Sequence, residues 1–492
     1  MLPDSLLERY SEFLATRIGL HYPEERWRDL ERATRQAAKE LGFDDAESCV
    51  EQLLSRPVSR SQVEVLASHL TVGETYFFRD RAVFDALELR VLPELIRSRQ
   101  AGARRLRIWS AGCCTGEEAY SIAILLTRLI PDPQAWNILI LATDINPHFL
   151  RKGSRGLYTD WSFRDAPAGV KEGFFKRTKE GIEIAARVRA MVTFEYHNLA
   201  EDAYPSVQTN TNAMDIIFCR NVLMYFKPDR SGQLVGRLAS SLLEGGWLFV
   251  SAVDMPRVLQ PHLAEVKFPG AIAYRKETML AVAERRPPMA ASLPAQSEQP
   301  APEGHRHASA VAVAASAEFR GAQANEAQPT PYQEASELYR QGRYAEAAER
   351  LQGTLDLSPG DPSVMGLLAR IYANQGRFAE AEQWCGKAIA ADKLNPQWCY
   401  LLATILQEQG QLEAAVAALK RALYLEPAHA MAHFALASVT RKQGKLKDSQ
   451  RHLRNAQSIL ERIAPQEVLP ESEGITVGRL AEIIASTTKV WR

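Results

Sequence analysis

The sequence is short of the features that mark secreted, membrane-spanning and metal-binding proteins. It has only six cysteines and no CxxC spacing, so it indicates a reduced cytosolic protein without a disulfide framework or a metal site. No run of 18 apolar residues occurs, and the first residues lack the basic and apolar segments of a signal peptide. We therefore expect no membrane insertion. Lys plus Arg and Asp plus Glu number 59 each, and this balance does not point to nucleic acid as a partner.

A strand, a glycine turn and a helix organise the chain. Residues 106–109 form an apolar run, residues 110–116 break it with two glycines, and helical spacing resumes at Glu117. A second apolar strand, residues 138–143, ends at Asp144, whose carboxylate can accept hydrogen bonds from a ribose over the first turn. The pattern predicts an α/β domain that binds a nucleoside.

The residues of the turn favour a cofactor with a cationic end. Gly112 and Gly116 do not form GxGxxG, and no Lys-Ser/Thr pair follows as a phosphate-binding loop requires. Glu117 and Glu118 place negative charge where a pyrophosphate would need helix N–H groups, whereas S-adenosylmethionine carries a sulfonium and an ammonium. The alternative is an ordinary strand-helix turn whose two glutamates stabilise the helix dipole.

Residues 4 to about 70 have helical spacing and predict a small helical unit. One of its helices carries a basic stripe at positions i, i+4, i+7 and i+11, which consists of Arg28, Arg32, Arg35 and Lys39. Such a stripe can dock an acidic partner helix, and we predict a substrate-docking role for it. It can equally be a solvated face balanced by Glu24, Glu25, Asp29 and Glu31, so spacing alone leaves both interpretations open.

Four separated motifs resemble one known family. They are TVGETYFFRD at 71–80, SAGCCTGEEAYS at 110–121, ATDIN at 142–146 and DIIFCRNVLMYF at 215–226. Together they are similar to the chemotaxis receptor glutamate O-methyltransferases (the CheR family), and the resemblance spans roughly residues 5 to 284. It implies methylation of receptor glutamates with S-adenosylmethionine, which becomes S-adenosylhomocysteine.

The resemblance also implies roles for individual residues. Arg79 and Tyr225 are the expected catalytic residues, with Arg79 near the methyl-transfer centre and Tyr225 orienting the substrate. Glu117 is expected to hold the methionine ammonium and Asp144 the ribose hydroxyls. The remaining cofactor contacts expected from the family are Gly73, Thr75, Arg79, Asn198, Leu199, Asn221 and Val222. Gly73 departs from the family, because some members have Asn there and a side-chain contact is then missing.

The chemistry requires little of the protein. A glutamate carboxylate is ionised at neutral pH and can attack a sulfonium methyl directly, so no general base, covalent nucleophile or metal is needed. Cys113, Cys114 and Cys219 then need no catalytic role, because a cysteine mechanism would require a base beside the thiol.

A repeat follows a change in composition. Residues 285–329 are rich in Pro, Ala, Ser, Gln and Glu and predict a disordered linker. Beyond it, Gly342, Gly376, Gly410 and Gly444 recur every 34 residues, with Ala335, Ala369, Ala403 and Ala437 in the same period. This spacing is typical of tetratricopeptide repeats, which bind other proteins.

The expected fold is an α/β Rossmann-like class I methyltransferase with an N-terminal helical domain and a small antiparallel β insert, followed by an all-α tetratricopeptide solenoid. We expect helices at 1–72, the methyltransferase domain at 73–284, its insert at about 153–190, repeats at 330–462 and a capping helix within 463–492. Within the insert, the alternation of Ile182, Ile184, Ala186 and Val188 predicts short antiparallel strands. The pair of runs 271–275 and 278–283 is expected to end the seven-stranded sheet.

The expected function is methylation of glutamates on the cytoplasmic helices of a methyl-accepting receptor, with the repeats binding another signalling protein. The expected location is the cytoplasm, which allows recruitment to receptor arrays. The alternative is an inactive scaffold that binds receptor and cofactor. A methyltransferase acting on a small molecule or nucleic acid is disfavoured, because the helical unit with its basic stripe suits an acidic helical protein. The sequence does not name the receptor or the output pathway.

Overall fold

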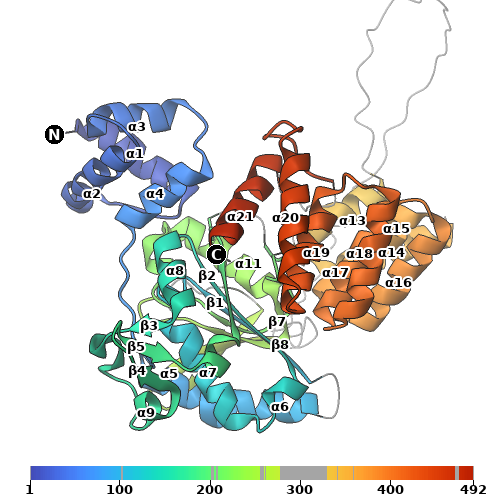
Figure 1. The fold of residues 1–492 in the computed structure, drawn as a ribbon, viewed down its shortest axis with the longest axis horizontal. Helices are drawn as coiled ribbons and strands as arrows, with labels where there is room; N and C mark the ends of the chain where they lie inside the picture. Colours follow the sequence, from blue (N-terminus) through green and yellow to red (C-terminus); the bar gives the residue numbers. More distant parts are fainter. Residues whose placement is uncertain are drawn as a thin grey trace, which may run out of the picture.

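The computed structural model describes residues 2–100, 104–200, 204–206, 209–254, 260, 262–277, 330–340, 342–357, 360–470 and 476–490. Figure 1 shows a group of amino-terminal helices, a central α/β sheet and a stack of carboxy-terminal helices beside it. The predicted linker at 285–329 lies outside the described residues. Within the described ranges, no helix has the length and hydropathy needed to cross a bilayer.

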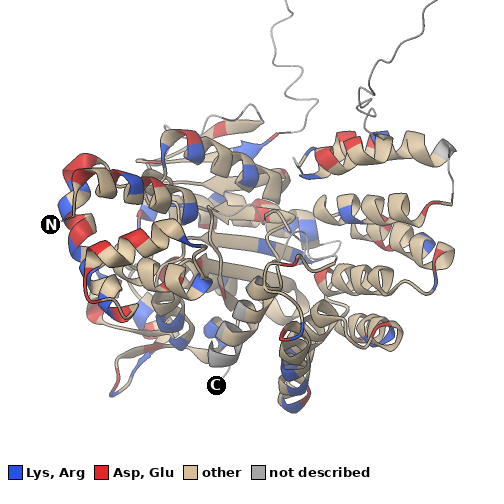
Figure 2. Cartoon of the chain, turned by 90° about the horizontal axis from the view of Figure 1, so that it is seen from above, with Lys and Arg blue, Asp and Glu red and all other residues tan. Residues whose placement is uncertain are grey.

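The amino-terminal unit consists of helices α1 (Asp4–Arg17), α2 (Trp27–Glu40), α3 (Ala46–Ser55) and α4 (Arg60–Leu70). Tyr10, Leu14 and Leu30 are fully buried between them. Asp45 caps α3, and a capping box between Ser59 and Gln62 starts α4, so side chains satisfy the first N–H groups of both helices. Acidic and basic residues alternate over the outer surface of this unit in Figure 2.

The central sheet has seven strands in the order β6-β2-β1-β7-β8-β10-β9. Their bounds are β1 (Arg105–Ala111), β2 (Asn137–Asp144), β6 (Val192–Tyr196), β7 (Met214–Phe218), β8 (Leu242–Phe249), β9 (Leu263–Phe268) and β10 (Ala271–Lys276). β10 is antiparallel to β8 and β9, whereas the pairs formed by β1, β2, β6, β7 and β8 are parallel. The chain order reverses between β1 and β7, and a ligand crevice is expected beyond the carboxyl ends of those strands.

Helices cover both faces of the sheet. On one face, α5 (Arg81–Ala86), a π-helical turn (Leu87–Val91), α6 (Leu92–Gln100) and α7 (Glu117–Leu129) share an apolar cluster with Ile108, Ile140 and Phe218. On the other face, α11 (Pro228–Ser241) packs over Trp109 and Ile217. Because the parallel strands are buried from both sides, their sequences read as continuous apolar runs. The predicted Rossmann-like α/β architecture is confirmed.

A small antiparallel sheet stands beside the main one, as predicted, in the order β3-β5-β4. Its strands are β3 (Leu157–Tyr158), β4 (Phe175–Arg177) and β5 (Ile182–Ile184), with α8 (Pro147–Arg155) before it and α9 (Val170–Phe174) and α10 (Ala186–Arg189) within the insert region. The predicted strand character of Ala186 and Val188 is wrong, because both lie in α10. Alternation over so few residues fits one turn of helix as well as a strand.

One of the two predicted final runs is a described strand of the sheet. Residues 271–275 lie in β10 (Ala271–Lys276), which pairs with β9 (Leu263–Phe268), a strand that was not predicted. The run from Thr278 to Ala283 lies outside the described residues.

The carboxy-terminal array consists of four antiparallel helix pairs and a last helix. The pairs are α13 (Pro331–Arg340) with α14 (Tyr344–Leu357), α15 (Pro362–Asn374) with α16 (Phe378–Ala391), α17 (Pro396–Glu408) with α18 (Leu412–Leu425), and α19 (Ala430–Lys442) with α20 (Leu446–Leu460). The last helix is α21 (Val477–Val490). Each pair turns at a glycine with φ between +73° and +76°, a conformation that ends helices and favours glycine. The predicted all-α array of helical repeats is confirmed.

Candidate active site

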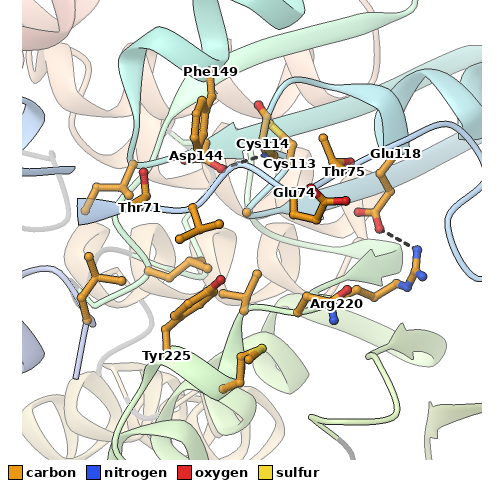
Figure 3. A pocket seen from close by; sticks show the side chains of 18 of the residues that line it. Thr71, Glu74, Thr75, Cys113, Cys114, Glu118, Asp144, Phe149, Arg220 and Tyr225 are labelled. Atoms are coloured by element: carbon orange, nitrogen blue, oxygen red, sulfur yellow. Dashed lines mark hydrogen bonds and ion pairs between the residues drawn. The ribbon is translucent and has the colours of Figure 1, made fainter. Parts of the chain in front are cut away.

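A cavity of about 400 Å³ lies at the carboxyl ends of β1, β2 and β7. Ile18 and Leu20 line it from the amino-terminal helices, and the segment 71–79 crosses above the sheet to form another wall. Figure 3 shows Asp144 and Phe149 on one side of the cavity and Tyr225 on the opposite side. The cavity therefore lies at the crevice that the strand order predicts.

The turn between β1 and α7 forms the floor of the cavity. Gly112 has φ +78°, and a Cβ atom there would lie 2.5 Å from Cγ2 of Val222, so glycine is required both for its backbone conformation and for space. Cys114, with φ +50°, directs its N–H to Oδ2 of Asp144 at 2.9 Å. The turn and the end of β2 are thereby held together.

Asp144 is positioned to accept hydrogen bonds from a sugar. Its side chain is 8% exposed and lines the cavity, with Oδ1 accepting from the Asn146 N–H at 2.8 Å. The two backbone donors use one lone pair on each oxygen, which leaves further acceptor sites directed at the cavity. Burial raises the pKa of Asp144 to about 6, although the backbone hydrogen bonds oppose the shift.

We expect cofactor binding to weaken as pH falls through about 6. The raised pKa means that the Asp144 carboxylate is ionised above that pH and protonated below it, and protonation removes acceptor sites that ribose hydroxyls would use. A titration of S-adenosylhomocysteine by calorimetry between pH 5 and 8 measures the effect. The Asp144→Asn variant should bind more weakly and lose the dependence, so an unchanged pH profile in that variant would contradict the assignment.

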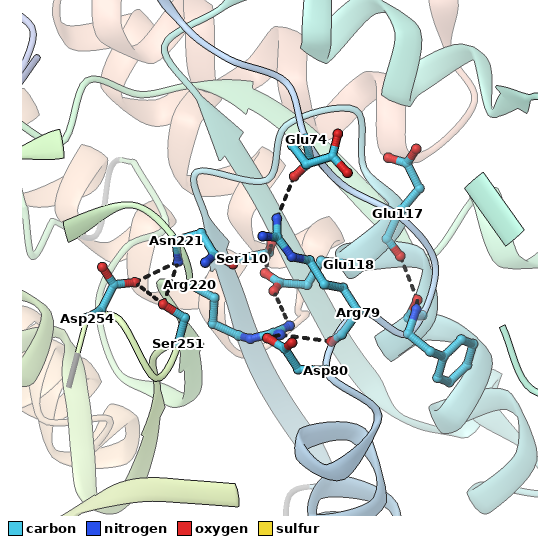
Figure 4. A network of polar contacts seen from close by, with 12 residues as sticks. Glu74, Arg79, Asp80, Ser110, Glu117, Glu118, Arg220, Asn221, Ser251 and Asp254 are labelled. Carbon is cyan, nitrogen blue, oxygen red and sulfur yellow. Dashed lines mark hydrogen bonds and ion pairs between the residues drawn. The ribbon is translucent and has the colours of Figure 1, made fainter. Parts of the chain in front are cut away.

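The two glutamates that open α7 face different surroundings. Glu118 lines the cavity, accepts from the Ser110 hydroxyl at 2.7 Å and pairs with Arg220 at 3.0 Å. Glu117 is 1% exposed and accepts hydrogen bonds from the hydroxyls of Thr115 at 2.6 Å and Ser162 at 3.1 Å. In Figure 4 its carboxylate points away from the Arg220 network. Glu117 thus lies behind the lining residues of the cavity.

Glu117 is nevertheless a buried carboxylate that is suited to pair with an ammonium group. Among the described residues, no Lys or Arg forms an ion pair with it, and burial raises its pKa. A buried carboxylate without a cation is costly, whereas Glu118 is already neutralised by Arg220. We expect Glu117→Gln to weaken S-adenosylmethionine binding about tenfold or more and Glu118→Gln to weaken it less. Calorimetric titration of both variants tests this, and the reverse order would assign the ammonium to Glu118.

A buried arginine connects segments that line the cavity. The Arg220 side chain is 3% exposed, forms an ion pair with Asp80 and donates to the backbone oxygen of Arg79 at 2.8 Å, as Figure 4 shows. Arg79 itself lines the cavity, where its guanidinium donates to the backbone oxygen of Glu74 at 2.6 Å. The network fixes the backbone of residues 79–80 against β7, and the Arg79 side chain extends toward the cavity from that anchor.

The segment after β7 is held by a second buried acid. Asp254 is fully buried and accepts from the N–H groups of Asn221 at 2.6 Å and Met224 at 2.9 Å, and from the Ser251 hydroxyl at 2.7 Å. Asn221 has φ +57°, a strained conformation for a residue other than glycine, and these hydrogen bonds maintain it. Asp254 thereby positions the predicted pair Asn221 and Val222.

The amino-terminal helices contact the other predicted residues. Asn198 donates to the backbone oxygen of Arg17 at 2.7 Å, and the backbone oxygen of Tyr225 accepts from the His21 N–H at 2.8 Å. Burial raises the pKa of Tyr225, so its hydroxyl remains a proton donor at neutral pH. Gly73 leaves space for Phe149, because a Cβ at position 73 would lie 2.7 Å from the ring.

Most of the predicted site residues surround one cavity. Those that line it are Thr75, Arg79, Asp144, Asn198, Leu199, Asn221, Val222 and Tyr225, whereas Gly73 and Glu117 do not. Three further residues at or beside the cavity, Phe149, Arg220 and Asp254, were not predicted from the sequence. Arg220 directly precedes the predicted Asn221 in the fourth motif and could have been found there, whereas Phe149 and Asp254 carry no sequence signal. Burial raises the thiol pKa of Cys113 and Cys114, so neither is an activated nucleophile.

The basic stripe lies on the exposed side of α2. Arg28, Arg32, Arg35 and Lys39 are all exposed. Arg32 pairs with Asp29 at 2.8 Å and Arg35 with Glu31 at 2.6 Å, so part of the positive charge is balanced within the helix. The geometry permits either a docking role or a solvated face.

Comparison with known proteins decides the family. The sequence model described as the CheR methyltransferase SAM-binding domain matches residues 73–260. A probable chemotaxis protein methyltransferase of Rhizobium etli is 34% identical over 203 residues, which is 40% of this chain and 74% of that protein. The chain belongs to the CheR methyltransferase family. Chemotaxis protein methyltransferase 1 of Pseudomonas aeruginosa is 32% identical over 218 residues, 43% of this chain and 77% of the relative.

Two further matches add to the description of this CheR-family chain. The probable biofilm formation methyltransferase WspC of P. aeruginosa is 29% identical over 306 residues, 60% of this chain and 69% of the relative. A tetratricopeptide model matches residues 338–405. The predicted combination of a CheR-type, S-adenosylmethionine-dependent protein-glutamate methyltransferase with tetratricopeptide repeats is confirmed.

The described residues fit S-adenosylmethionine, which when bound supplies a methyl group activated by its sulfonium. Asp144 offers acceptors for the ribose, and the buried Glu117 has no arginine or lysine paired with it among the described residues. Phe149 and Leu199 add apolar surface to the cavity wall. No step at this site requires a base, because the acceptor is a carboxylate that is already ionised.

Proposed function

We propose that this chain methylates glutamate side chains on the cytoplasmic helices of a methyl-accepting receptor. The observation that carries the proposal is the arrangement of Arg79 and Tyr225 on the wall of a cavity that Asp144 equips for a nucleoside. A guanidinium and a phenol can hold an incoming carboxylate by hydrogen bonds without transferring a proton to it. Their task is therefore to align the acceptor and exclude water.

The mouth of the cavity supports a protein substrate. Val72, Met224 and Val253 line the cavity and are 61%, 43% and 54% exposed. Apolar side chains at a rim are suited to the apolar positions on either side of a glutamate on an amphipathic helix. Such a helix can present one carboxylate to the cavity while its flanking residues cover the rim.

The reaction is tested with full-length enzyme, labelled S-adenosylmethionine and membranes that contain the receptors of the source organism. Base-labile label on receptor protein is the expected result, because methyl esters hydrolyse in base. Absence of label on every receptor, with cofactor still bound in a titration, would contradict the enzymatic proposal and favour a scaffold. We propose further that the enzyme acts in the cytoplasm beside receptor arrays and that its repeats bind another signalling protein.

The basic stripe on α2 is proposed to attract acidic receptor helices. Reversing charge with Arg32→Glu and Arg35→Glu should raise KM for receptor at least several-fold, leave KM for S-adenosylmethionine unchanged and reduce the salt dependence of methylation. Arg90→Glu with Arg97→Glu is the matched control, since both residues are exposed on the π-helical turn and α6. Equal effects of the two pairs would show that the stripe is an ordinary solvated face.

A further inference from the structure

Two arginines begin the central strand of the sheet, where apolar residues are expected. Arg105 and Arg107 lie in β1, and their side chains are only 8% and 4% exposed. Strands buried on both faces are usually rich in Val, Ile and Leu. Burying a guanidinium is costly unless a counter-ion and hydrogen bonds compensate it. The domain itself supplies Asp215, which accepts from the Arg107 N–H at 2.8 Å but is paired with Arg99 at 2.7 Å, so the two guanidinium groups need a further acid at this edge.

The acid comes from the repeat array, about 300 residues further along the chain. Glu408, the last residue of α17, forms an ion pair with Arg107 and lies 3.8 Å from Arg105. Arg107 also donates to the backbone oxygens of Asn210 at 2.8 Å and Asn212 at 3.2 Å. Glu408 is itself 3% exposed, so acid and arginines are buried together.

Arg105 is less fully compensated than Arg107. Its guanidinium lies 4.4 Å from the ring centroid of Phe378, an aromatic residue at the start of α16 in the array. Burial lowers the pKa of Arg105 to about 9, with the neighbouring Arg107 lowering it further and Glu408 and Asp215 opposing the shift. The cation is thus compensated partly by Asp215 of its own domain and partly by Glu408 and Phe378 of the array.

Three successive inter-helix turns of the array contact the amino-terminal edge of the sheet. A Cβ atom at each turn glycine would lie 2.6 to 3.2 Å from the methyltransferase domain, with Gly342 against Ser240, Gly376 against Leu243 and Gly410 against Asn137. At the fourth turn, a Cβ atom at Gly444 would have no neighbouring heavy atom of the described residues within 4 Å. The side chain of Asn137 also donates to the backbone oxygen of Glu408 at 3.1 Å.

Apolar contacts surround the ion pair. Ala213, which precedes β7, is 1% exposed and belongs to the buried apolar cluster of the first repeats, and Leu243 of β8 packs against that cluster. The turns thus meet the starts of β8, β7 and β2 as the repeats advance. In Figure 1 the array stands beside this end of the sheet.

We propose that the tetratricopeptide array is a built-in partner of the methyltransferase domain, docked by its first three turns with Glu408 as the ionic anchor, and that this interface holds without the covalent connection. Residues 278–329 separate the described parts, so the connection is long and the position of the array depends on the contacts themselves.

Docking leaves the amino-terminal ends of the same helices open. A second cavity is lined by residues at the starts and middles of α13, α15 and α17, including Tyr332, Leu367 and Trp398. The docking contacts lie at the carboxyl ends of these helices, about ten residues and roughly 15 Å further along α17. A protein bound in the second cavity would therefore be held at a fixed position relative to the active site.

The test uses the full chain with a specific protease sequence inserted after Gly304. The purified protein is cleaved, and the two pieces are analysed by gel filtration at low micromolar concentration. We expect the pieces of the otherwise unchanged protein to elute together. Pieces carrying Glu408→Lys should separate, because three buried cations would then face one another. Glu426→Lys is the matched control, since Glu426 is exposed at the opposite end of the same repeat.

A variant on the methyltransferase side of the interface controls for the possibility that Glu408→Lys separates the pieces by unfolding the array. Leu243→Asp leaves every repeat residue unchanged and should also separate the pieces, while both pieces keep their helical circular dichroism. Separation of the unsubstituted pieces would overturn the proposal. Co-elution of the Glu408→Lys pieces would equally overturn the role of Glu408. The measurement does not involve methyl transfer, so its outcome is independent of the proposed substrate.

Discussion

Replacing Arg79 with alanine is expected to lower methyl transfer to receptor by about 10² to 10³-fold, the usual effect of removing one preorganised donor from an active site. Arg79 lines the cavity and its backbone is anchored by Arg220, so the loss should fall on alignment of the carboxylate. Cofactor binding should be partly retained. The measurement pairs kcat/KM for labelled methyl transfer with calorimetric titration of S-adenosylhomocysteine.

The matched control is Arg81→Ala, because Arg81 is exposed on α5 and pairs with Asp85 outside the cavity. Its transfer rate should stay close to that of the unsubstituted protein. Arg79→Lys retains the charge but loses the forked donor geometry, and an intermediate rate is expected. Normal turnover of the Arg79→Ala variant would show that Arg79 is not needed for methyl transfer, and Tyr225 would then be the remaining candidate for holding the carboxylate.

Replacing Asp144 with alanine is expected to weaken cofactor binding about 100-fold, which corresponds to about 3 kcal/mol. The variant loses the acceptors for a ribose and also leaves the N–H groups of Cys114 and Asn146 without their partner. Calorimetric titration gives the affinity, and kcat at saturating cofactor should be changed much less.

The control for this variant is Asp85→Ala, an acidic residue on α5 whose ion pair with Arg81 lies at the surface. A thermal melt distinguishes weak binding from loss of the fold. If Asp144→Ala bound the cofactor normally, the assignment of β2 as the ribose-binding strand would fail.

Periodicity made much of the fold predictable. An apolar run predicts the strand that ends at Asp144, and a 34-residue period predicts the repeats that turn at Gly342, Gly376 and Gly410. Both signals are visible in the sequence without knowledge of the fold. Ala186 and Val188 were misread because a short alternating segment has no length with which to distinguish a strand from a helical turn.

The site was predictable where it lies at the ends of strands, and less so elsewhere. Glu117 and Glu118 are adjacent, but successive residues on a helix point about 100° apart, and only the fold decides which one faces a cavity. Phe149 enters the wall because Gly73 makes room for it, a condition set by two separate segments. The ion pair between Arg107 and Glu408 joins residues in different domains, so no local sequence pattern predicts it.

The contact between Gly73 and Phe149 also bears on any attempt to exchange cofactor-binding residues among members of the family. The residue types at positions 73 and 149 depend on each other, because the Phe149 ring occupies the volume that a side chain at position 73 would need. An asparagine grafted at 73 alone would push the ring away from the cavity wall, whereas a smaller residue at 149 introduced together with it would accommodate the graft. Residue 149 therefore belongs in any comparison of how these enzymes hold their cofactor, beside the motif residues themselves.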